Sequence, residues 1–501
     1  MKGKLLIMVV FMASMMMPYA VSAQYRTGVQ TEAPKTEAEL ILERADSSET
    51  PVIISLEQAL EIALSENVSV KVADMEIRRT EYAKKGSYAA LFPQIDASGA
   101  YQRTIKKQVM YMDFDMGSLG GAMGGGTEGG DVELPGAGEE SPMPEVSMAD
   151  GLEVGRWNTW SAGISAAMPL VNAQLWKSIK VSGLDVELAV EKARSSRLDM
   201  VTQVKNAYYG TLLAKEAFDV YRQVYDNAVK NLEETQKRYD AQKASEMELI
   251  RAKTTVANAV PNVYNAESSV ILSLWQLKAV LGVDLDMNID IDGKLADYAQ
   301  QMFYDIHQYD NAGLENNTTM KQLAIQAEML AENIKLQKYA YIPSLALAFN
   351  YSMNAMTNDF NFSEYRWTPY SYIGLSLNIP IFSGGKRYHQ VKQARNQYDQ
   401  MQLQVVNTER QLKIAIRQSL TTMETNMKSY YAAKDAVTSA QKGYDIAEAS
   451  YKVGRSTLIE LNDAQLALTQ SQLAESQAIY NFIIAKAQLE QTLGNDFVQN
   501  N

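Results

Sequence analysis

The sequence predicts a mixed fold in which long coiled-coil helices, duplicated in tandem, are joined to membrane-type β-strands. Three observations predict it. The chain repeats itself, each half contains one very long helical run without proline, and each half contains two segments with the alternating pattern of strands. Helices of this length do not fit inside an ordinary globular core, so the fold is expected to be elongated.

Composition limits the class of protein. The 501 residues are 46% hydrophobic and 21% charged, with a formal net charge of -12, which predicts a folded protein rather than a disordered one. The acidic balance argues against a nucleic-acid partner. There is no cysteine, and the two histidines, His307 and His389, are far apart. This excludes disulfides, thiolate metal sites, cysteine nucleophiles and a lipid-modified cysteine.

The N-terminus has the pattern of a secretory signal peptide. A short basic start precedes an apolar run at 5–17 and small residues at 21–23, which predicts a signal peptide over 1–23 and a linker over 24–53. A retained membrane anchor is disfavoured, because a spanning helix needs about 20 apolar residues. Since no long apolar run follows, the mature chain can cross a membrane only with strands.

Internal repetition defines the domain organisation. The stretch YDAQKASEMEL from Tyr239 aligns with YKVGRSTLIEL from Tyr451, and LKAVLGVD from Leu277 aligns with LEQTLGND from Leu489 at the same offset. Each half has the order helix, strand, loop, strand, long helix, turn, helix. We predict a first repeat at 54–286, an inter-repeat segment at 287–319, a second repeat at 320–495 and a C-terminal tail at 496–501.

The strand segments are apolar on one side only. In SLALAFNYSMNAM, Leu345, Leu347 and Phe349 share one face, whereas small and polar residues share the other, which is the period of a strand. Strands of about 10 residues with an apolar outside, a polar inside and aromatic flanks are typical of membrane barrels. A soluble sheet with one buried face would show the same pattern, so the strands alone leave that alternative open.

The first pair of strands encloses a long Gly-rich and acidic segment at 112–151. This composition predicts a flexible surface loop. Its methionines could be soft ligands for a metal such as Cu(I), but their spacing is irregular. We therefore predict neither a metal site nor a cofactor.

Two helical runs, from about Ala173 to Arg238 and from about Gly385 to Tyr451, lack proline and each spans roughly 100 Å. Two shorter helices flank each run, for example over 56–91 and 246–281. We predict a coiled-coil rod in which one long helix lies beside two short ones stacked end to end. A local kink is expected at Pro261.

Barrel closure limits the number of chains. The duplication supplies four strands per chain, whereas the smallest membrane barrels have about eight. One chain therefore cannot close a barrel, and several chains must share one, with their helices continuing it as a tube.

Several stretches together resemble the TolC-type outer-membrane efflux family: ISLEQALEIALSENVSVKVADMEIRRTEY near the start, LNIPIFSGGKR at a strand-to-helix turn, then YKVGRSTLIELNDAQLAL and LEQTLG near the end. The resemblance covers about 54–494. It implies a trimeric α-barrel in the periplasm of a Gram-negative bacterium, continuous with a shared twelve-stranded outer-membrane β-barrel, with four strands from each chain.

The resemblance also implies a function and partners. It predicts a passive exit duct for an efflux or type I secretion system, surrounded by outer-membrane lipid and docked to a periplasmic adaptor and an inner-membrane pump. The nature of the substrate, whether drug, metal or protein, stays open, as do the pump and the adaptor.

The family's periplasmic constriction can be placed by counting from Gly454. Its two constriction carboxylates fall on Glu460 and Asp463, its gate tyrosine falls on Tyr451, and the first repeat contributes the acidic partner Glu248. Three copies of the acidic pair around a narrow pore would favour cations. From sequence alone, solvated residues on an exposed helix face are the favoured interpretation of this pair; the repeat and the resemblance together favour the constriction instead.

Two positions depart from the family pattern. The gate arginine is expected where Ser456 stands, so we take Arg455, one position earlier, as the gate candidate. Gln242 occupies the place of a usual glycine in the first hairpin. The hairpin tips predicted to dock the adaptor are Gln242, Lys243, Ala244, Ser245, Val453, Gly454, Arg455 and Ser456.

Two other function classes are weighed against a channel. A periplasmic or surface coiled-coil scaffold, such as an adhesin, would explain the helices but not amphipathic strands at the same point in both repeats. An enzyme is disfavoured, because the sequence contains no GxSxG, HExxH or phosphate-binding loop.

Overall fold

The computed structural model describes residues 41–42, 45, 50–110, 152–302, 313–361 and 364–495. The predicted signal peptide, most of the linker, the whole Gly-rich loop, His307 and the C-terminal tail lie outside these residues. The chain divides into two compact units. We call residues 1–71, 197–311 and 417–491 the hairpin unit, and residues 72–196, 312–416 and 492–501 the strand unit.

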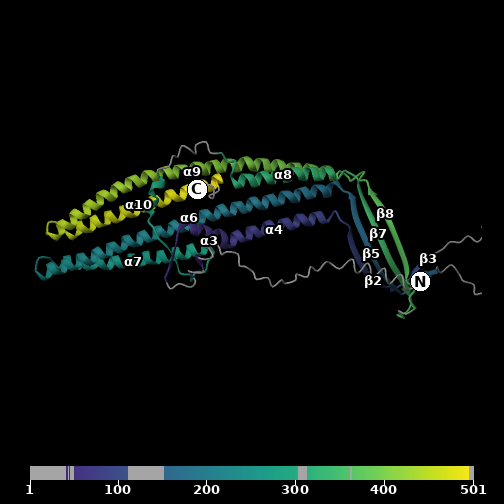
Figure 1. Cartoon of the computed structure of the whole chain (residues 1–501), viewed down its shortest axis with the longest axis horizontal. Coiled ribbons are helices and arrows are strands. Elements are labelled where there is room, and N and C mark those ends of the chain that lie inside the picture. Colours follow the sequence, from purple (N-terminus) through teal and green to yellow (C-terminus); the bar gives the residue numbers. More distant parts are fainter. Residues whose placement is uncertain are drawn as a thin grey trace, which may run out of the picture. The chain divides into compact units, whose positions relative to one another are not determined.

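The strand unit contains one four-stranded antiparallel sheet (Figure 1). Its strands are β2 (Gln94–Arg103), β5 (Asn158–Val171), β7 (Ser344–Thr357) and β8 (Thr368–Asn378), in the order β2-β5-β7-β8. Two strands come from each repeat, as predicted. A separate short pair, β3 (Gln108–Met110) and β4 (Leu152–Val154), is also antiparallel.

The register of β7 and β8 gathers the apolar residues on one face. Leu345 lies opposite Leu377, whereas Ser344 lies opposite Asn378. Along β8, Leu377 is 61%, Leu375 66% and Ile373 72% exposed. A soluble sheet buries its apolar face, and patches of this kind mark contact with an apolar partner. The exposure therefore counts against the soluble-sheet alternative.

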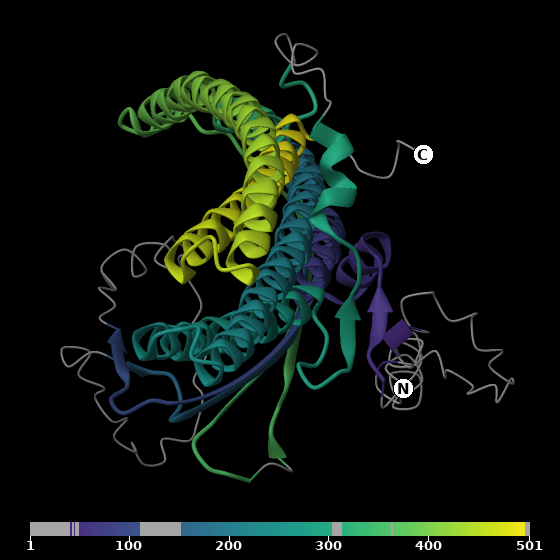
Figure 2. The same cartoon turned by 90° about the vertical axis from the view of Figure 1, so that its left-hand side faces the viewer.

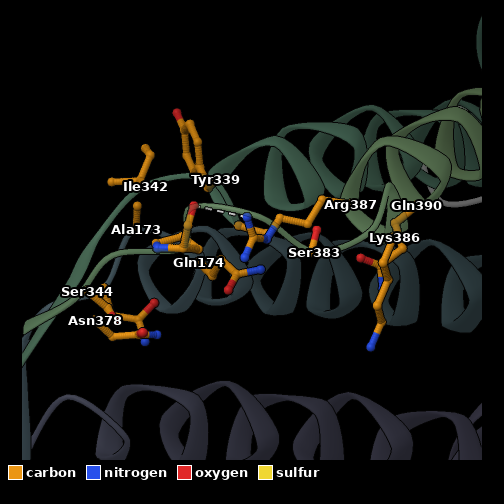
Figure 3. A pocket seen from close by; sticks show the side chains of 13 residues that line it. Ala173, Gln174, Tyr339, Ile342, Ser344, Asn378, Ser383, Lys386, Arg387 and Gln390 are labelled. Carbon is orange, nitrogen blue, oxygen red and sulfur yellow. Dashed lines mark hydrogen bonds between the residues drawn. The ribbon is translucent and has the colours of Figure 1, made fainter.

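A polar cavity of about 390 Å³ lies where β7 and β8 meet the helices (Figure 3). Its lining includes Ser344 and Asn378, the paired residues at the strand ends, and Arg387 from the start of a helix. Arg387 Nη1 donates to the carbonyl oxygen of Pro380 at 3.1 Å, and the guanidinium lies 5.6 Å from the Tyr341 ring. Arg387 thus fixes the turn that leads from strand to helix.

The long helices are α6 (Ala173–Asp240) and α9 (Lys386–Lys452), which agree with the predicted limits to within two residues. In the hairpin unit, α7 (Glu246–Leu281) lies antiparallel beside the end of α6, and α10 (Leu458–Leu493) lies beside the end of α9 (Figures 1 and 2). Helix α7 continues through Pro261, and the kink there stays a prediction. No described helix contains an apolar stretch of the length that a bilayer span requires.

The helix expected over 56–91 is instead two helices, α3 (Leu56–Glu66) and α4 (Val68–Ala89). Asn67 interrupts it with an extended backbone, ψ 130°. Its side-chain Oδ1 accepts the Ser69 N–H at 2.7 Å, so Asn67 ends one helix and caps the next. The second repeat has a single helix at this place, α8 (Thr318–Tyr339).

The inter-repeat segment is attached to the hairpin unit. Strand β6 (Ile289–Ile291) pairs in parallel with β1 (Val52–Ile54), and a 3₁₀ helix, η2 (Leu295–Met302), follows. Two side chains of α6 hold the segment: Lys215 pairs with Asp290 at 2.7 Å, and Glu216 accepts the Leu295 N–H at 2.7 Å.

A buried carboxylate connects α6 to α8 in the strand unit. The Glu332 side chain is almost completely buried and is contacted by Lys177, by Lys180 at 3.0 Å and by Lys335 at 3.0 Å. Burial by itself raises the pKa of the Glu332 carboxyl, but hydrogen bonds from the three lysines outweigh it and lower the pKa to about 2.

The short helices meet through a contact that occurs once in each repeat. Asn67 Nδ2 donates to Val280 O at 2.8 Å, two positions before Gly282, which has φ 78°. Likewise, Asn317 Nδ2 donates to Thr492 O at 2.6 Å, two positions before Gly494. Each glycine adopts the left-handed conformation that ends a helix. These contacts give the predicted end-to-end junctions a physical basis.

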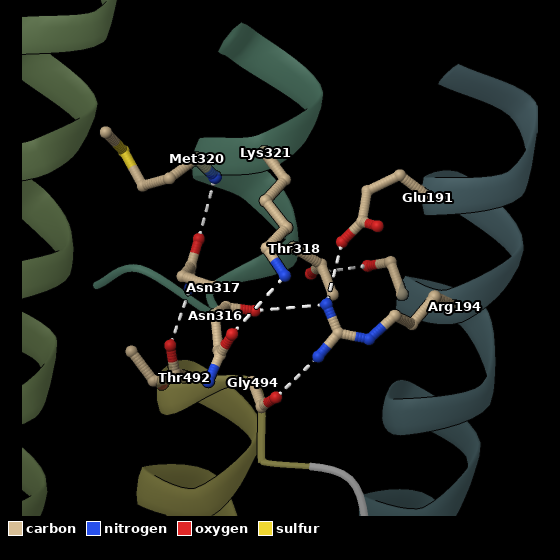
Figure 4. Close-up of polar contacts among 10 residues, drawn as sticks. Glu191, Arg194, Asn316, Asn317, Thr318, Met320, Lys321, Thr492 and Gly494 are labelled. Carbon is tan, nitrogen blue, oxygen red and sulfur yellow. Dashed lines mark hydrogen bonds and ion pairs between the residues drawn. The ribbon is translucent and has the colours of Figure 1, made fainter. Parts of the chain in front are cut away.

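The second junction has an additional residue, Arg194 of α6 (Figure 4). Its Nη2 donates to Gly494 O at 2.6 Å and its Nη1 donates to Asn316 O at 3.2 Å, while Glu191 accepts from the same guanidinium at 2.9 Å. Arg194 therefore connects the residue that follows α10, Gly494, with the segment that precedes α8.

Candidate functional site

The first hairpin tip ends α6 with a Schellman motif. The Lys243 N–H donates to Arg238 O at 2.7 Å, and the Gln242 N–H donates to Tyr239 O at 2.8 Å. Gln242 has φ 59° and is the sole non-glycine residue with positive φ among the described residues. The motif requires this left-handed conformation, which is why a glycine is usual at this position.

The second tip ends α9 with the same motif. The Arg455 N–H donates to Ser450 O at 2.8 Å, the Gly454 N–H donates to Tyr451 O at 3.0 Å, and Gly454 has φ 77°. The sequence repeat therefore extends to matching hydrogen bonds at the two tips.

Replacing Gln242 with glycine should stabilise the protein by about 0.5–1 kcal/mol, because a non-glycine side chain in the left-handed region costs roughly 1 kcal/mol. The reverse change at the matched position, Gly454→Gln, should destabilise it by a similar amount. Thermal unfolding of the two purified variants measures both. Equal unfolding temperatures for Gln242→Gly and the parent protein would contradict the assigned backbone strain.

Each tip leads into a capped helix. The Ser245 hydroxyl accepts the Glu248 N–H at 3.2 Å, and the Thr457 hydroxyl accepts the Glu460 N–H at 3.3 Å. Glu460 also accepts the Thr457 N–H at 2.9 Å, which completes a capping box. Glu460 thus has a local structural role at the start of α10 in addition to any role in a pore.

Tyr451 is the buried centre of the site, with 2% of its surface exposed. Its hydroxyl hydrogen-bonds the Thr235 hydroxyl at 2.6 Å. Burial raises the pKa of Tyr451, the hydrogen bond with Thr235 opposes that rise, and the charge of Glu248 adds to it. The structure therefore brings together two residues that the sequence assigned to the gate, Tyr451 and Glu248.

Tyr451 also belongs to an apolar cluster that joins the two hairpins. Its buried neighbours come from α7, α9 and α10, with Leu232 of α6 packed against them; the buried members are Ala252, Tyr444, Tyr451, Leu458, Leu461 and Leu468. Polar contacts continue along the same seam: Asn227 donates to Gln465 at 2.9 Å, and Asn462 donates to Thr255 at 3.2 Å.

The arginine that contacts Tyr451 is Arg238 of α6. Its Nη1 donates to Tyr451 O at 3.1 Å, and its guanidinium lies 5.0 Å from the centre of the ring. Arg455, the candidate from sequence, is exposed and makes no ion pair with the described residues. Ser456 donates to Ala447 O at 3.2 Å. Sequence reasoning missed Arg238 and Thr235, because nothing in the sequence indicates which residues of one hairpin meet the other.

Glu460 and Asp463 lie one helical turn apart on α10 and are both exposed. The Asp463 side chain makes no hydrogen bond or ion pair with the described residues. In a single chain both carboxylates therefore have the surroundings of solvated residues, and a constriction requires further copies of the chain. The remaining tip residues, including Lys243 and Val453, are also largely exposed.

The chain is similar in sequence to known outer-membrane proteins. The family model described as outer membrane efflux protein matches residues 59–283 and 311–495. The outer membrane protein TolC of Vibrio cholerae is 22% identical over 361 residues, which cover 70% of this chain and 82% of that protein. TolC of Escherichia coli is 23% identical over 353 residues, covering 67% and 70%.

Solved structures share the fold. The Campylobacter jejuni CmeC outer membrane channel superposes with a TM-score of 0.65 at 16% identity, covering 89% of each chain. The outer membrane protein VceC of Vibrio cholerae superposes with a TM-score of 0.64 at 16% identity, covering 88% of this chain and 96% of VceC.

The family match spans both repeats and includes the strands, the long helices and both hairpin tips. The chain therefore belongs to the outer membrane efflux protein family and is an outer-membrane exit duct of an efflux or secretion system, with its helical part in the periplasm.

Proposed function

We propose that three copies of the chain form one channel, in which each copy contributes four strands to a shared twelve-stranded barrel. The sheet of one chain supports this. Among the described strands, β2 and β8 pair on one side only, and unpaired edges of this length readily take up another strand. Four strands are also too few to close a barrel, which needs about eight. Pairing of β2 of one copy with β8 of the next provides a partner for each unpaired edge and supplies enough strands to close the barrel.

The proposed domain organisation follows from this assembly. Residues 54–286 and 320–495 are the two structural repeats, each contributing two strands and a helical hairpin. Residues 287–319 form the segment between them at the level where the helical ends meet. The proposal also includes a signal peptide at 1–23, a linker at 24–53 and a tail at 496–501.

The channel works with two partners, a periplasmic adaptor that docks on the hairpin tips and an inner-membrane pump that delivers the substrate. The tips support this role because they are exposed and combine small and polar residues. Relatives serve different cargoes: one is named a toluene efflux pump outer membrane protein of Pseudomonas putida, and another an alkaline protease secretion protein of Pseudomonas aeruginosa. The duct is passive, and its cargo is set by the pump.

Glu460 and Asp463 form the periplasmic constriction of this channel. The observation that carries the assignment is their position: both are exposed on one face of α10, within two turns of the second tip. Three copies of the pair around one pore concentrate negative potential in a confined aqueous space, where little bulk solvent screens it. Such a ring attracts cations and binds multivalent cations more strongly.

The constriction is tested by the double variant Glu460→Ala, Asp463→Ala in planar-bilayer recordings. Cation selectivity and block by multivalent cations should both fall, by about thirtyfold for the block if each of the two rings contributes roughly 1 kcal/mol. The unfolding temperature should change little, because exposed charges and one capping contact contribute about 1 kcal/mol or less.

A control variant removes two negative charges elsewhere. Asp399 and Asp435 are exposed residues of α9 that have no ion pair with the described residues, so Asp399→Ala, Asp435→Ala should leave selectivity unchanged. Unchanged selectivity in the Glu460→Ala, Asp463→Ala channel would contradict the constriction assignment. It would show that the two carboxylates are ordinary solvated residues.

A further inference from the structure

Arg238 takes part in both hairpin tips of one chain. Its carbonyl oxygen accepts the Lys243 N–H at 2.7 Å, which is the longer-range bond of the first tip's motif. Its side chain reaches across to the second hairpin and donates to Tyr451 O at 3.1 Å. One residue thus has its backbone fixed by the first tip and its guanidinium bound to the second.

The Arg238 guanidinium lies beside the carbonyl end of α9 and the Tyr451 ring, and both attract a positive charge. Tyr451 O is also the acceptor of the Gly454 N–H at 3.0 Å, so Arg238 binds the same carbonyl as the turn itself. A Cβ atom at Gly454 would lie 3.6 Å from Arg238 Nη2, which places the guanidinium against the turn. The C-terminal end of a helix carries partial negative charge, and an aromatic face attracts a cation.

Within the described part of the chain, no equivalent contact runs from the second hairpin to the first tip. The residue that matches Arg238 in the second tip motif is Ser450, whose carbonyl accepts the Arg455 N–H, and its short side chain cannot span two hairpins. Tyr239, which matches Tyr451, is 37% exposed, whereas Tyr451 is 2% exposed. The repeat is therefore asymmetric: the second tip is capped by the first, and the first is not capped by the second.

We propose that Arg238 is a positioning residue that couples the two tips, so that a displacement of the first tip is transmitted to Tyr451 and to the last turn of α9. A partner that distorts the turn at Gln242 and Lys243 alters the bond that fixes the Arg238 backbone. The guanidinium then leaves the Tyr451 carbonyl, and the second tip loses its external cap. The consequence for conduction rests on the constriction and docking proposed above, whereas the coupling itself does not.

Hydrogen exchange of the purified, full-length protein tests the coupling. In Arg238→Ala, the amides of Gly454 and Arg455 should exchange about tenfold faster, because the second tip loses a charge-assisted hydrogen bond and a cation over the ring. The amides of Gln242 and Lys243 should change less than about twofold, since the acceptor carbonyl of residue 238 is retained.

Two further variants sharpen the test. Arg238→Lys keeps the positive charge but not the planar fork, and it should give an increase of about threefold at Gly454 and Arg455. Lys237→Ala changes the adjacent residue, whose ion pair with Glu234 at 3.1 Å stays within α6. It should leave the exchange of both tips unchanged.

The proposal is overturned if Gly454 and Arg455 keep their protection in a folded Arg238→Ala protein, or if both tips lose protection equally, which would indicate general loosening of the hairpins. If Arg238→Ala does not fold, Arg238→Lys decides by the same criterion. Exchange does not depend on conduction. A selective loss of protection at the second tip, together with unchanged selectivity in Glu460→Ala, Asp463→Ala, would support the coupling and contradict the constriction.

Discussion

Replacing Gly494 with alanine should cost about 4 kcal/mol or more of folding free energy, the range reserved for severe backbone conflicts. The new Cβ atom would collide with the Asn316 carbonyl group, lying 2.6 Å from its carbon atom, and the backbone at φ 72° disfavours any side chain. Moving the chain to relieve this collision would also break the hydrogen bonds from Asn317 to Thr492 O and from Arg194 to Gly494 O. Circular dichroism on heating the purified protein in detergent measures the effect.

Gly443 provides the matched control. It lies inside α9, and a Cβ atom there would meet no atom within 4 Å. Gly443→Ala should therefore stabilise the protein slightly, by up to about 1 kcal/mol, because alanine is the better helix former. Similar unfolding temperatures for Gly494→Ala and Gly443→Ala would show that the junction tolerates a side chain, and would refute its assigned role.

Replacing Glu332 with glutamine should destabilise the folded protein by about 2 kcal/mol, because Lys177 and Lys335 lose their counter-ion and Lys180 keeps only the more distant Glu328. This loss of folding free energy is smaller than that for breaking a fully buried ion pair, because Lys180 and Lys335 are half exposed. Glu328→Gln is the control: Glu328 is half exposed and lies 3.6 Å from Lys180, so its loss should be nearly neutral.

The same carboxylate gives a pH dependence with a definite sign. Its pKa is about 2 in the folded protein against an ordinary value of 4.5. The unfolded state therefore binds the proton more tightly, and the stabilisation is complete above about pH 4.5 and is lost as the pH falls toward 2. The difference in unfolding temperature between the parent protein and Glu332→Gln should shrink over that interval. A difference that stays constant from pH 6 to pH 3 would contradict the depressed pKa.

Much of the fold could be predicted because it is governed by local patterns that occur twice. The absence of proline fixed the extent of α6 and α9, and the alternation of residues in β7 identified its apolar face. The break at Asn67 was missed, because the segments on either side of it are both helical. The interruption depends on Asn67 donating to Val280, a residue more than 200 positions away that no local pattern can indicate.

The site was predictable to a similar degree. Tyr451 and Glu248 follow from the position of Gly454 and from the repeat, and they do approach each other. The prediction of Arg455 as the partner arginine assumed that the second hairpin supplies its own cation. Arg238 occupies that place instead because α6 packs against α9 through Thr235 and Leu232. The spacing of residues in the sequence does not indicate such a tertiary contact between hairpins.

The central claim, that the duct is built from several chains, is tested most directly by the mass of the purified protein in detergent. Multi-angle light scattering, corrected for bound detergent, should give the mass of three chains. Circular dichroism on the same sample should show intact strands alongside the dominant helices. A monodisperse particle with the mass of one chain and intact strands would contradict the account, because four strands would then be stable in the membrane without closing a barrel.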